Sequence, residues 1–174
     1  MKRLPKYTPA EVRNDPYGFT YKEMSEVIGE NEAKALYEEL YKQLPRKKNL
    51  SMLVKNICKS SDTEKYVYEL KDNKYIETVF IKRRDGGTVC VSTQVGCPVG
   101  CIFCESGRNG FVRNLTSSEI VQQIILLRRK VNRIVFMGMG EPLFNYDNLI
   151  KAIHILRDRN GLNFPTDGIT VSTV

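Results

Sequence analysis

The chain has 174 residues, of which 41% are hydrophobic and 27% charged, and its 27 lysines and arginines against 20 acidic residues give a net charge of +7. This composition excludes a disordered chain and suggests one domain, or one domain with a small appendage. No apolar run approaches the roughly 18 residues of a membrane span, and the basic N-terminus has no apolar segment behind it as a secretory signal would. We therefore expect a cytoplasmic protein without membrane contact.

The positive charge is compatible with a polyanionic partner such as RNA, and equally with an ordinary solvated basic surface. The basic residues are spread along the chain rather than gathered in one tail. Three runs stand out: Arg46-Lys47-Lys48, Lys82-Arg83-Arg84 and Arg128-Arg129-Lys130.

The first part of the chain has a helical pattern. Apolar residues recur at three- and four-residue steps from about residue 20 to 44, and Gly29 is placed to divide this stretch into two short helices. We expect residues 1–60 to form a helical accessory region that takes no part in chemistry.

Residues 61–94 read as a β-hairpin followed by a further strand. Two alternating, β-rich runs flank a turn at residues 71–74, and a second turn at residues 85–87 precedes the strand TVCVSTQ. The next stretch, residues 95–110, contains four glycines and one proline in sixteen residues. Such a stretch resists regular structure and suits backbone that surrounds a ligand.

Helices and strands alternate after residue 110. Thr116 to Glu119 reads as a capping box for a helix with a basic last turn at residues 128–130, and residues 133–137 form a short apolar strand. A loop at 138–145, a helix from Tyr146 stopped by Asn160-Gly161, and a strand at 168–174 follow.

This order predicts an α/β fold, with residues 95–174 as an incomplete core of β/α units around a parallel sheet or barrel. The sequence ends on an apolar strand with no closing helix, so we expect the core to be truncated.

The cysteines give the clearest chemical signal. Three of the five, Cys97, Cys101 and Cys104, lie within eight residues, and without a secretion signal this clustering favours metal ligation over disulfides. Thiolates suit both iron–sulfur clusters and zinc. A zinc site would need a fourth ligand, such as Cys90 or the sole histidine, His154, and no second Cys-x-x-Cys pair exists. The spacing favours a cluster with one open iron, and zinc remains the alternative.

The spacing Cys-x-x-x-Cys-x-aromatic-Cys, with Phe103 as the aromatic residue, resembles the signature of the radical S-adenosylmethionine superfamily. The runs YIETVFIKRRDGGTVCVSTQ, VCVSTQVGCPVGCIFCESGRNGFVRNLTSSEI, MGMGEPLFN and ITVSTV resemble, in order, the RlmN/Cfr family of RNA methyltransferases. The likeness is strong from about residue 64 to 174. That family methylates carbon 2 or carbon 8 of adenosine in RNA, and the resemblance implies 23S rRNA as the substrate, with tRNA as a second candidate.

The resemblance implies a [4Fe-4S] cluster on Cys97, Cys101 and Cys104, whose open iron holds the amino and carboxylate groups of S-adenosylmethionine. An electron from a donor such as flavodoxin or ferredoxin then gives a 5′-deoxyadenosyl radical. Gly140 and Glu141 match the family's contact to the methionine amino group, and Ser172 matches another cofactor contact. Apart from the family, these residues read as a tight turn and an ordinary strand residue.

Two further residues receive roles from the resemblance. Glu77 matches the glutamate assigned as a proton acceptor, although from the sequence alone it reads as a surface carboxylate paired with a lysine across the hairpin. Cys90 matches a cysteine that pairs transiently with the catalytic, methyl-carrying cysteine, and its other reading is a small apolar strand residue.

The chain also departs from the family pattern. Pro98-Val99-Gly100 and Glu105 differ from the usual residues, and Glu105 puts an acidic side chain beside the cluster. The C-terminal motifs, including the methyl-carrying cysteine, have no counterpart before Val174, so we expect an N-terminal portion that does not complete methyl transfer alone. The alternatives are a radical enzyme acting on a non-RNA substrate and a non-catalytic metal- or RNA-binding module.

Overall fold

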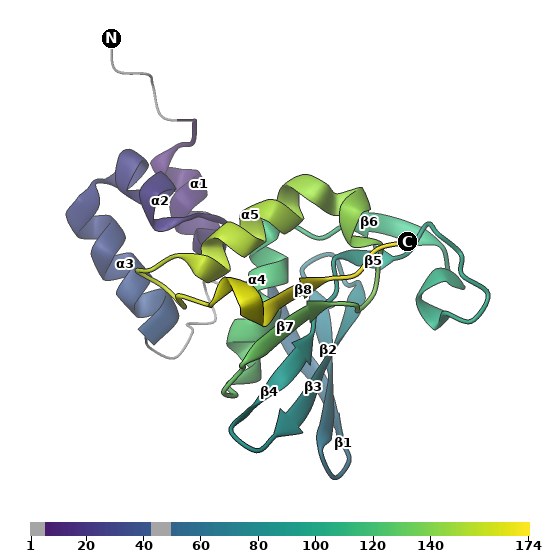
Figure 1. The fold of residues 1–174 in the computed structure, drawn as a ribbon. Coiled ribbons are helices and arrows are strands. Elements are labelled where there is room, and N and C mark those ends of the chain that lie inside the picture. Colours follow the sequence, from purple (N-terminus) through teal and green to yellow (C-terminus); the bar gives the residue numbers. More distant parts are fainter. Residues whose placement is uncertain (1–5, 43–49) are drawn as a thin grey trace.

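A computed structural model describes residues 6–42 and 50–174. The fold is organised around one mixed sheet flanked by helices (Figure 1). The helices are α1 (Pro9–Asn14), α2 (Tyr21–Ile28), α3 (Glu30–Lys42), α4 (Ser117–Leu127) and α5 (Tyr146–Arg157). The strands are β1 (Met52–Lys59), β2 (Thr63–Leu70), β3 (Tyr75–Arg83), β4 (Gly86–Cys90), β5 (Gln94–Gly96), β6 (Phe111–Asn114), β7 (Arg133–Phe136) and β8 (Ile169–Val171).

The main sheet has six strands in the order β1-β2-β3-β4-β7-β8. Its first four strands run antiparallel to their neighbours, whereas β4, β7 and β8 are parallel, with Cys90 opposite Val135 and Val135 opposite Thr170. The predicted α/β class with parallel β/α units is therefore confirmed. Because the parallel strands share a direction, their carboxyl ends meet at one edge of the sheet, and the loops that leave this edge carry the candidate residues.

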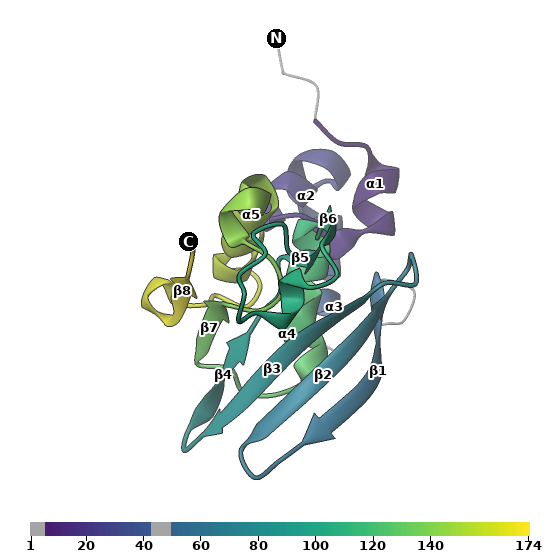
Figure 2. The ribbon, with the colours of Figure 1, turned by 90° about the vertical axis from the view of Figure 1, so that its right-hand side faces the viewer.

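Helix α4 covers one face of this sheet (Figure 2). Along β3, Ile76, Thr78 and Phe80 are buried while the residues between them are partly exposed, which is the two-residue alternation of a strand with one covered face. The Tyr68 hydroxyl donates to the Gln123 carbonyl of α4 at 3.1 Å, which fixes the helix against the sheet. Burial of each large apolar side chain in this layer contributes about 2 kcal/mol.

The N-terminal helices pack against the α4 and α5 side of the molecule (Figure 1). Asp158, which follows α5, accepts hydrogen bonds from the Tyr21 amide at 2.8 Å and from the Tyr37 hydroxyl at 3.3 Å. The Ser118 hydroxyl of α4 donates to Asp15, whose carboxyl pKa is raised by burial. As predicted, Gly29 separates α2 from α3, at a φ of 84° that favours glycine.

The structure corrects several sequence-based boundaries. Residues 52–59 form strand β1, so the prediction of a helical region through residue 60 is wrong there, because pairing with β2 outweighs local preference. Helix α4 ends at Leu127 with Arg128 in the left-handed conformation, so the basic run lies beyond the helix rather than in its last turn. Strand β8 ends at Val171. The predicted helical residue 44 and the run at 46–48 lie outside the described residues.

The predicted strand at residues 88–94 is interrupted, because β4 ends at Cys90 and β5 begins at Gln94. The other predicted elements are present. The Thr116–Glu119 capping box forms with both of its hydrogen bonds, and the turns at 71–74 and 85–87 join strands as expected. Within residues 6–42 and 50–174, no helix is both long and apolar enough to cross a bilayer.

Candidate functional site

The three clustered cysteines lie on one loop between β5 and β6. These two strands pair antiparallel, and the Cys97 amide donates to the Gly110 carbonyl at 3.2 Å. Gly96 has a φ of 74°, and a Cβ there would collide with the Gly110 carbonyl oxygen. Glycine is therefore required where the two ends of the loop meet.

The cysteines themselves are free thiols and half-buried. The Cys104 amide donates to the Cys101 carbonyl at 3.0 Å, which makes a tight turn. Among the described residues, no group of three or more histidine, cysteine, aspartate or glutamate side chains is gathered to hold a metal ion. The loop supplies the three soft donors that an iron–sulfur cluster takes, and its sulfur atoms must converge when they bind one.

The loop is joined to the end of β7 through Gln94. The Gln94 side-chain oxygen accepts from the Glu141 amide at 2.8 Å, and its nitrogen donates to the Asn114 side-chain oxygen at 2.8 Å. Gly140 has a φ of 101°, and a Cβ there would lie 2.6 Å from the Gln94 Cβ. A buried glutamine thus links the loop at 138–145 to both strands that carry the cysteine loop.

Glu141 is a buried carboxylate, with 5% of its surface exposed. Its partners are neutral: the Leu143 amide at 3.1 Å, the Thr173 hydroxyl at 2.5 Å and the Val174 amide at 3.3 Å. No lysine or arginine of the described chain forms an ion pair with it. A buried carboxylate held only by neutral donors is suited to receive a cationic group from a ligand.

Ser172 is exposed, and the residue that contacts Glu141 is its neighbour Thr173. The structure therefore brings the residues that follow β8 to Glu141, as expected for parallel neighbours. The cofactor contact predicted for Ser172 stays a prediction.

A buried polar network supports the same edge from beneath. The Gln123 side-chain oxygen of α4 accepts from the Thr78 hydroxyl at 2.7 Å and the Ser92 amide at 2.8 Å, and its nitrogen donates to the Ser92 carbonyl at 2.9 Å. The Ser92 hydroxyl donates to the Glu77 carbonyl at 2.6 Å and accepts from the Met139 amide at 2.9 Å. This network fixes the backbone that leads from β4 to the cysteine loop.

Asn145 fixes the following loop in the same way. Its side-chain nitrogen donates to the carbonyls of Thr93 and Leu115, both at 2.7 Å, and its oxygen accepts from Asn148 at 2.8 Å.

Glu77 lies at a hollow of about 390 Å³ between the β2–β3 hairpin and the cysteine loop. The hollow is also lined by Tyr75, Glu105 and Met139, so it brings Glu77 together with the loop at 138–145 and with the acidic residue that departs from the family pattern. The Glu77 carboxylate pairs with Lys65 across the hairpin at 2.9 Å. That pairing is the one expected from the hairpin sequence alone.

Cys90 is separate from the three clustered cysteines. It ends β4, opposite Val79 and Val135, on the face that α4 does not cover. Burial raises the pKa of its thiol, which favours the neutral form.

Arg113 clamps the exit of the cysteine loop. Its guanidinium donates to both Glu119 oxygens at 2.8 Å and to Asp72 at 2.7 Å, so β6, α4 and the β2–β3 turn share one ion-pair group. These hydrogen bonds lower the carboxyl pKa of Asp72 and raise the pKa of Arg113.

Several residues that position the site had no assigned role in the sequence. Gln94, Asn145 and Thr173 stand inside the recognised motif runs, which was the available signal, whereas Gln123 looks like an ordinary helix residue. Each of them is identified only by its hydrogen bonds across the fold.

Comparisons with known proteins show what the chain is similar to. Residues 91–174 match the family model of the radical SAM superfamily. A probable RNA methyltransferase of Rhodopseudomonas palustris is 57% identical over 112 residues, which cover 64% of this chain and 31% of that protein. A probable dual-specificity RNA methyltransferase RlmN of Thermosipho melanesiensis is 42% identical over 178 residues, covering 98% of this chain and 51% of the relative.

Among solved structures, a radical SAM methyltransferase from Sphaerobacter thermophilus superposes with a TM-score of 0.83 at 33% identity. The match covers 91% of this chain and 56% of that one. The chain thus spans about half the length of these relatives or less.

Proposed function

The chain belongs to the radical SAM superfamily, and we propose that it provides the radical-generating part of an RlmN-type enzyme that methylates adenosine in RNA. The observation that carries this proposal is the link between the cysteine loop and the buried Glu141 through Gln94. Through this link, three thiols and a carboxylate that has no ion pair within the described residues lie at one edge of the sheet.

We propose that Cys97, Cys101 and Cys104 hold a [4Fe-4S] cluster. When bound, the cluster supplies the electron that cleaves S-adenosylmethionine. The protein itself supplies three thiolates from one loop, and the pairing of β5 with β6 already fixes the ends of that loop.

We propose that Glu141 receives the ammonium group of S-adenosylmethionine. Its partners are neutral, so an ammonium would replace weak donors by a charge-assisted hydrogen bond in a buried setting. Gly140 allows the backbone to pass close to Gln94 at this point. Ser172 lies one residue from Thr173, the residue that bonds Glu141, and we propose that it contacts the same cofactor.

We propose that Glu77 acts on the RNA substrate and that Cys90 acts on the methyl-carrying cysteine. Glu77 would accept a proton at the hollow it shares with Glu105, which requires its carboxylate to leave Lys65. Cys90 would pair transiently with a methyl-carrying cysteine; its position on the uncovered face of the sheet leaves room for such a partner.

The proposed substrate is 23S rRNA, with tRNA as a second candidate; one relative named above is a probable dual-specificity RNA methyltransferase. The proposed reductant is a small electron carrier such as flavodoxin or ferredoxin, and the proposed location is the cytoplasm.

The test is anaerobic reconstitution of the 174-residue chain with iron and sulfide, followed by reduction in the presence of S-adenosylmethionine. We expect about four irons per chain and release of 5′-deoxyadenosine, without methylated RNA from this chain alone. Zinc in place of iron, or an iron-loaded chain that leaves S-adenosylmethionine intact, would overturn the proposal.

A substitution at Glu141 tests its proposed role separately. Glu141→Gln should keep the iron and weaken S-adenosylmethionine binding by about tenfold or more, because the loss of a charge-assisted hydrogen bond costs about 1.5–3 kcal/mol. The matched control is Glu26→Gln, on an exposed position of α2, which should change neither quantity. Equal affinities of the two variants would remove Glu141 from the cofactor site.

A further inference from the structure

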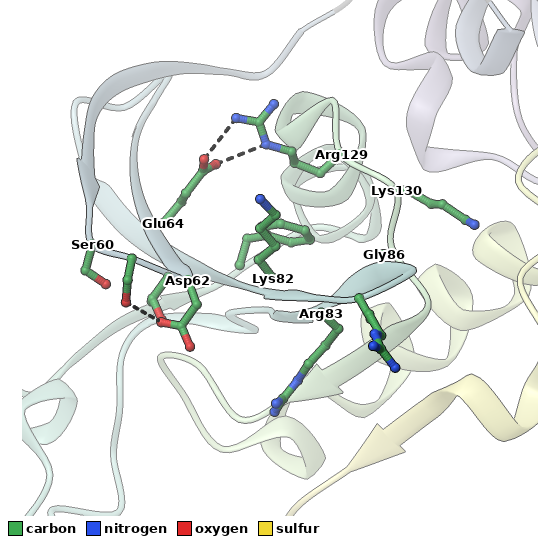
Figure 3. Close-up of a pocket in the computed structure, with 12 residues that line it drawn as sticks. Ser60, Asp62, Glu64, Lys82, Arg83, Gly86, Arg129 and Lys130 are labelled. Atoms are coloured by element: carbon green, nitrogen blue, oxygen red, sulfur yellow. Dashed lines mark hydrogen bonds and ion pairs between the residues drawn. The ribbon is translucent and has the colours of Figure 1, made fainter.

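A second hollow lies at the other end of the sheet, at the start of β4, away from the cysteine loop. It encloses about 460 Å³ and is formed by three segments: the β1–β2 turn, the β3–β4 turn and the residues that follow α4. Figure 3 shows these segments around Glu64, Lys82 and Gly86. We call this hollow the basic groove.

The lining of the basic groove is strongly cationic. Five basic side chains, Lys82, Arg83, Arg84, Arg129 and Lys130, face two carboxylates, Asp62 and Glu64. The hydroxyl-bearing residues Ser60, Ser61 and Thr63 complete its polar wall. Such a set of donors matches the oxygen atoms of phosphate groups.

Glu64 neutralises only one of these cations. Its carboxylate takes a two-point contact from Arg129, at 2.9 and 3.1 Å, and a hydrogen bond from the Tyr66 hydroxyl at 2.5 Å. These bonds lower the carboxyl pKa of Glu64 to about 2, so it is fully ionised and fully engaged at neutral pH. Lys59, at 3.7 Å, adds a further positive charge to the same carboxylate.

The other cations of the groove have no such partner. Within the described chain, no ion pair involves Lys82, Arg83, Arg84 or Lys130, and all four side chains are exposed. Asp62 accepts from the hydroxyls of Ser61 and Thr63 instead. In Figure 3, Arg129 folds over Glu64, while Arg83 and Lys130 extend away from it. Like charges gathered in this way repel one another, and an anionic partner relieves that repulsion.

The excess of positive charge is confined to the basic groove. An adjoining hollow of about 390 Å³ shares Arg83 with the groove, but its two arginines, Arg83 and Arg133, are balanced by two aspartates, Asp85 and Asp167. Phe80, the aromatic residue of the groove, has only 4% of its surface exposed, so it offers no face on which a base could stack. The surface is therefore suited to several linked phosphates rather than to a nucleobase.

We propose that the basic groove binds the phosphodiester backbone of RNA without reading its sequence. The choice of RNA as the polyanion rests on the proposed function, whereas the location of the surface rests on the charges and geometry of the groove itself. The groove and the cysteine loop lie at opposite ends of the sheet, so an RNA that reaches both must be folded or long. The groove would hold such an RNA while its target nucleotide enters the site at the cysteine loop.

The test compares two triple variants of the 174-residue chain. The groove variant, Lys82→Gln/Arg83→Gln/Lys130→Gln, removes three exposed charges that have no partner in the described structure. The control variant, Lys22→Gln/Lys34→Gln/Lys42→Gln, removes the same net charge from the exposed surface of α2 and α3. Urea unfolding should give the same midpoint for both variants and the parent chain.

Binding is measured with a fluorescently labelled rRNA hairpin at several potassium chloride concentrations. Each phosphate contact contributes about 0.7 to 0.9 to the slope of log affinity against log salt. We expect the groove variant to lose about 2 from this slope and about tenfold or more in affinity, and the control variant to bind like the parent chain. Unchanged binding by the groove variant, or an equal loss in the control variant, would overturn the proposal.

Two further measurements separate this inference from the proposed function. The groove variant should cleave S-adenosylmethionine like the parent chain in the absence of RNA, and a loss of cleavage would count against the groove as a surface distinct from the cofactor site. If the parent chain binds RNA through the groove but cleaves no cofactor, only the proposed function fails. Groove-dependent binding to vesicles of anionic lipid, with none to RNA, would refute the groove as an RNA surface.

Discussion

The cysteine loop and the scaffold beneath it are built in opposite ways. On the loop, Ile102 and Phe103 are 99% and 90% exposed, and the contacts that shape it are short backbone turns. In the scaffold, Gln94, Gln123 and Asn145 are at most 3% exposed, and the side-chain amides of all three are hydrogen-bonded across the fold. The difference indicates that the chain sets the position of the site in advance and leaves the final arrangement of the thiols to the ligand.

The largest expected effect comes from the loop, and it concerns iron rather than stability. Cys104→Ser should reduce bound iron from about four per chain to background, because a ligand is lost. The same change should alter the free energy of unfolding of the metal-free chain by less than about 0.5 kcal/mol. Iron analysis after reconstitution and urea unfolding measure the two effects. Cys58→Ser, at an exposed position on β1, is the control and should keep the iron.

A substitution in the scaffold should instead have its main effect on the free energy of unfolding. Gln123→Leu leaves the Thr78 hydroxyl and both backbone groups of Ser92 without their partner, and we expect a loss of about 3 kcal/mol of stability. Urea unfolding gives the value directly. The matched change on the loop, Asn109→Leu, is at an exposed position and should cost less than about 0.5 kcal/mol. Equal shifts in the two variants would show that the loop and the scaffold do not differ as described.

Breaking one ion pair in the scaffold and one on the cysteine loop extends the comparison between these two regions. Arg113→Gln removes the partner of Glu119, whose side chain is only 7% exposed, and should cost about 2 kcal/mol because a buried carboxylate is left unpaired. Arg108→Gln breaks the pair with Glu105 on the loop, where both side chains are more than 70% exposed, and should cost less than about 0.5 kcal/mol. If the unfolding temperature fell more for Arg108→Gln than for Arg113→Gln, the ion pairs of Arg113 would not stabilise the fold as described.

The smallest expected effect is a pH dependence at the far end of the scaffold. The pKa of Glu64 is lowered to about 2 from its ordinary value of 4.5, so its pairing stabilises the fold above pH 4.5 and this contribution disappears as the pH falls through about 2. Arg129→Gln should raise the Glu64 pKa and cost about 1 kcal/mol at pH 7, since the pair lies near the surface. The cost should shrink as the pH is lowered. Carbon-13 NMR titration of Glu64 and unfolding at two pH values check both statements, and a cost that grows in acid would contradict them.

Most of the elements that carry the site were predictable because their signals are local. The Thr116–Glu119 capping box, the glycine between α2 and α3 and the apolar strand at β7 each follow from a few neighbouring residues. Strand β1 was not predictable in this way, because it is stabilised by pairing with β2 along an edge where most of its own side chains are exposed.

The candidate site shows the same division. Cys97, Cys101, Cys104 and Glu141 stand in recognisable spacings, but their partners are chosen by the tertiary fold. Thr173, which follows β8, bonds Glu141, and the motif gave it no role. Gln123 lies 31 residues from Ser92, so no local pattern indicated that its amide would hold the backbone leading to the cysteines.

The backbone contact between Gly96 and Gly110 has a consequence for how readily the cysteines can gather around a ligand. Since β5–β6 pairing already joins the two ends of the loop, binding does not have to close a long segment of free chain. The conformational entropy lost on ligation is then confined to the short stretch between Cys97 and Asn109. A bulkier residue at position 96 would separate those ends and return the closure cost to the binding step, so iron affinity should fall even though every thiol is still present.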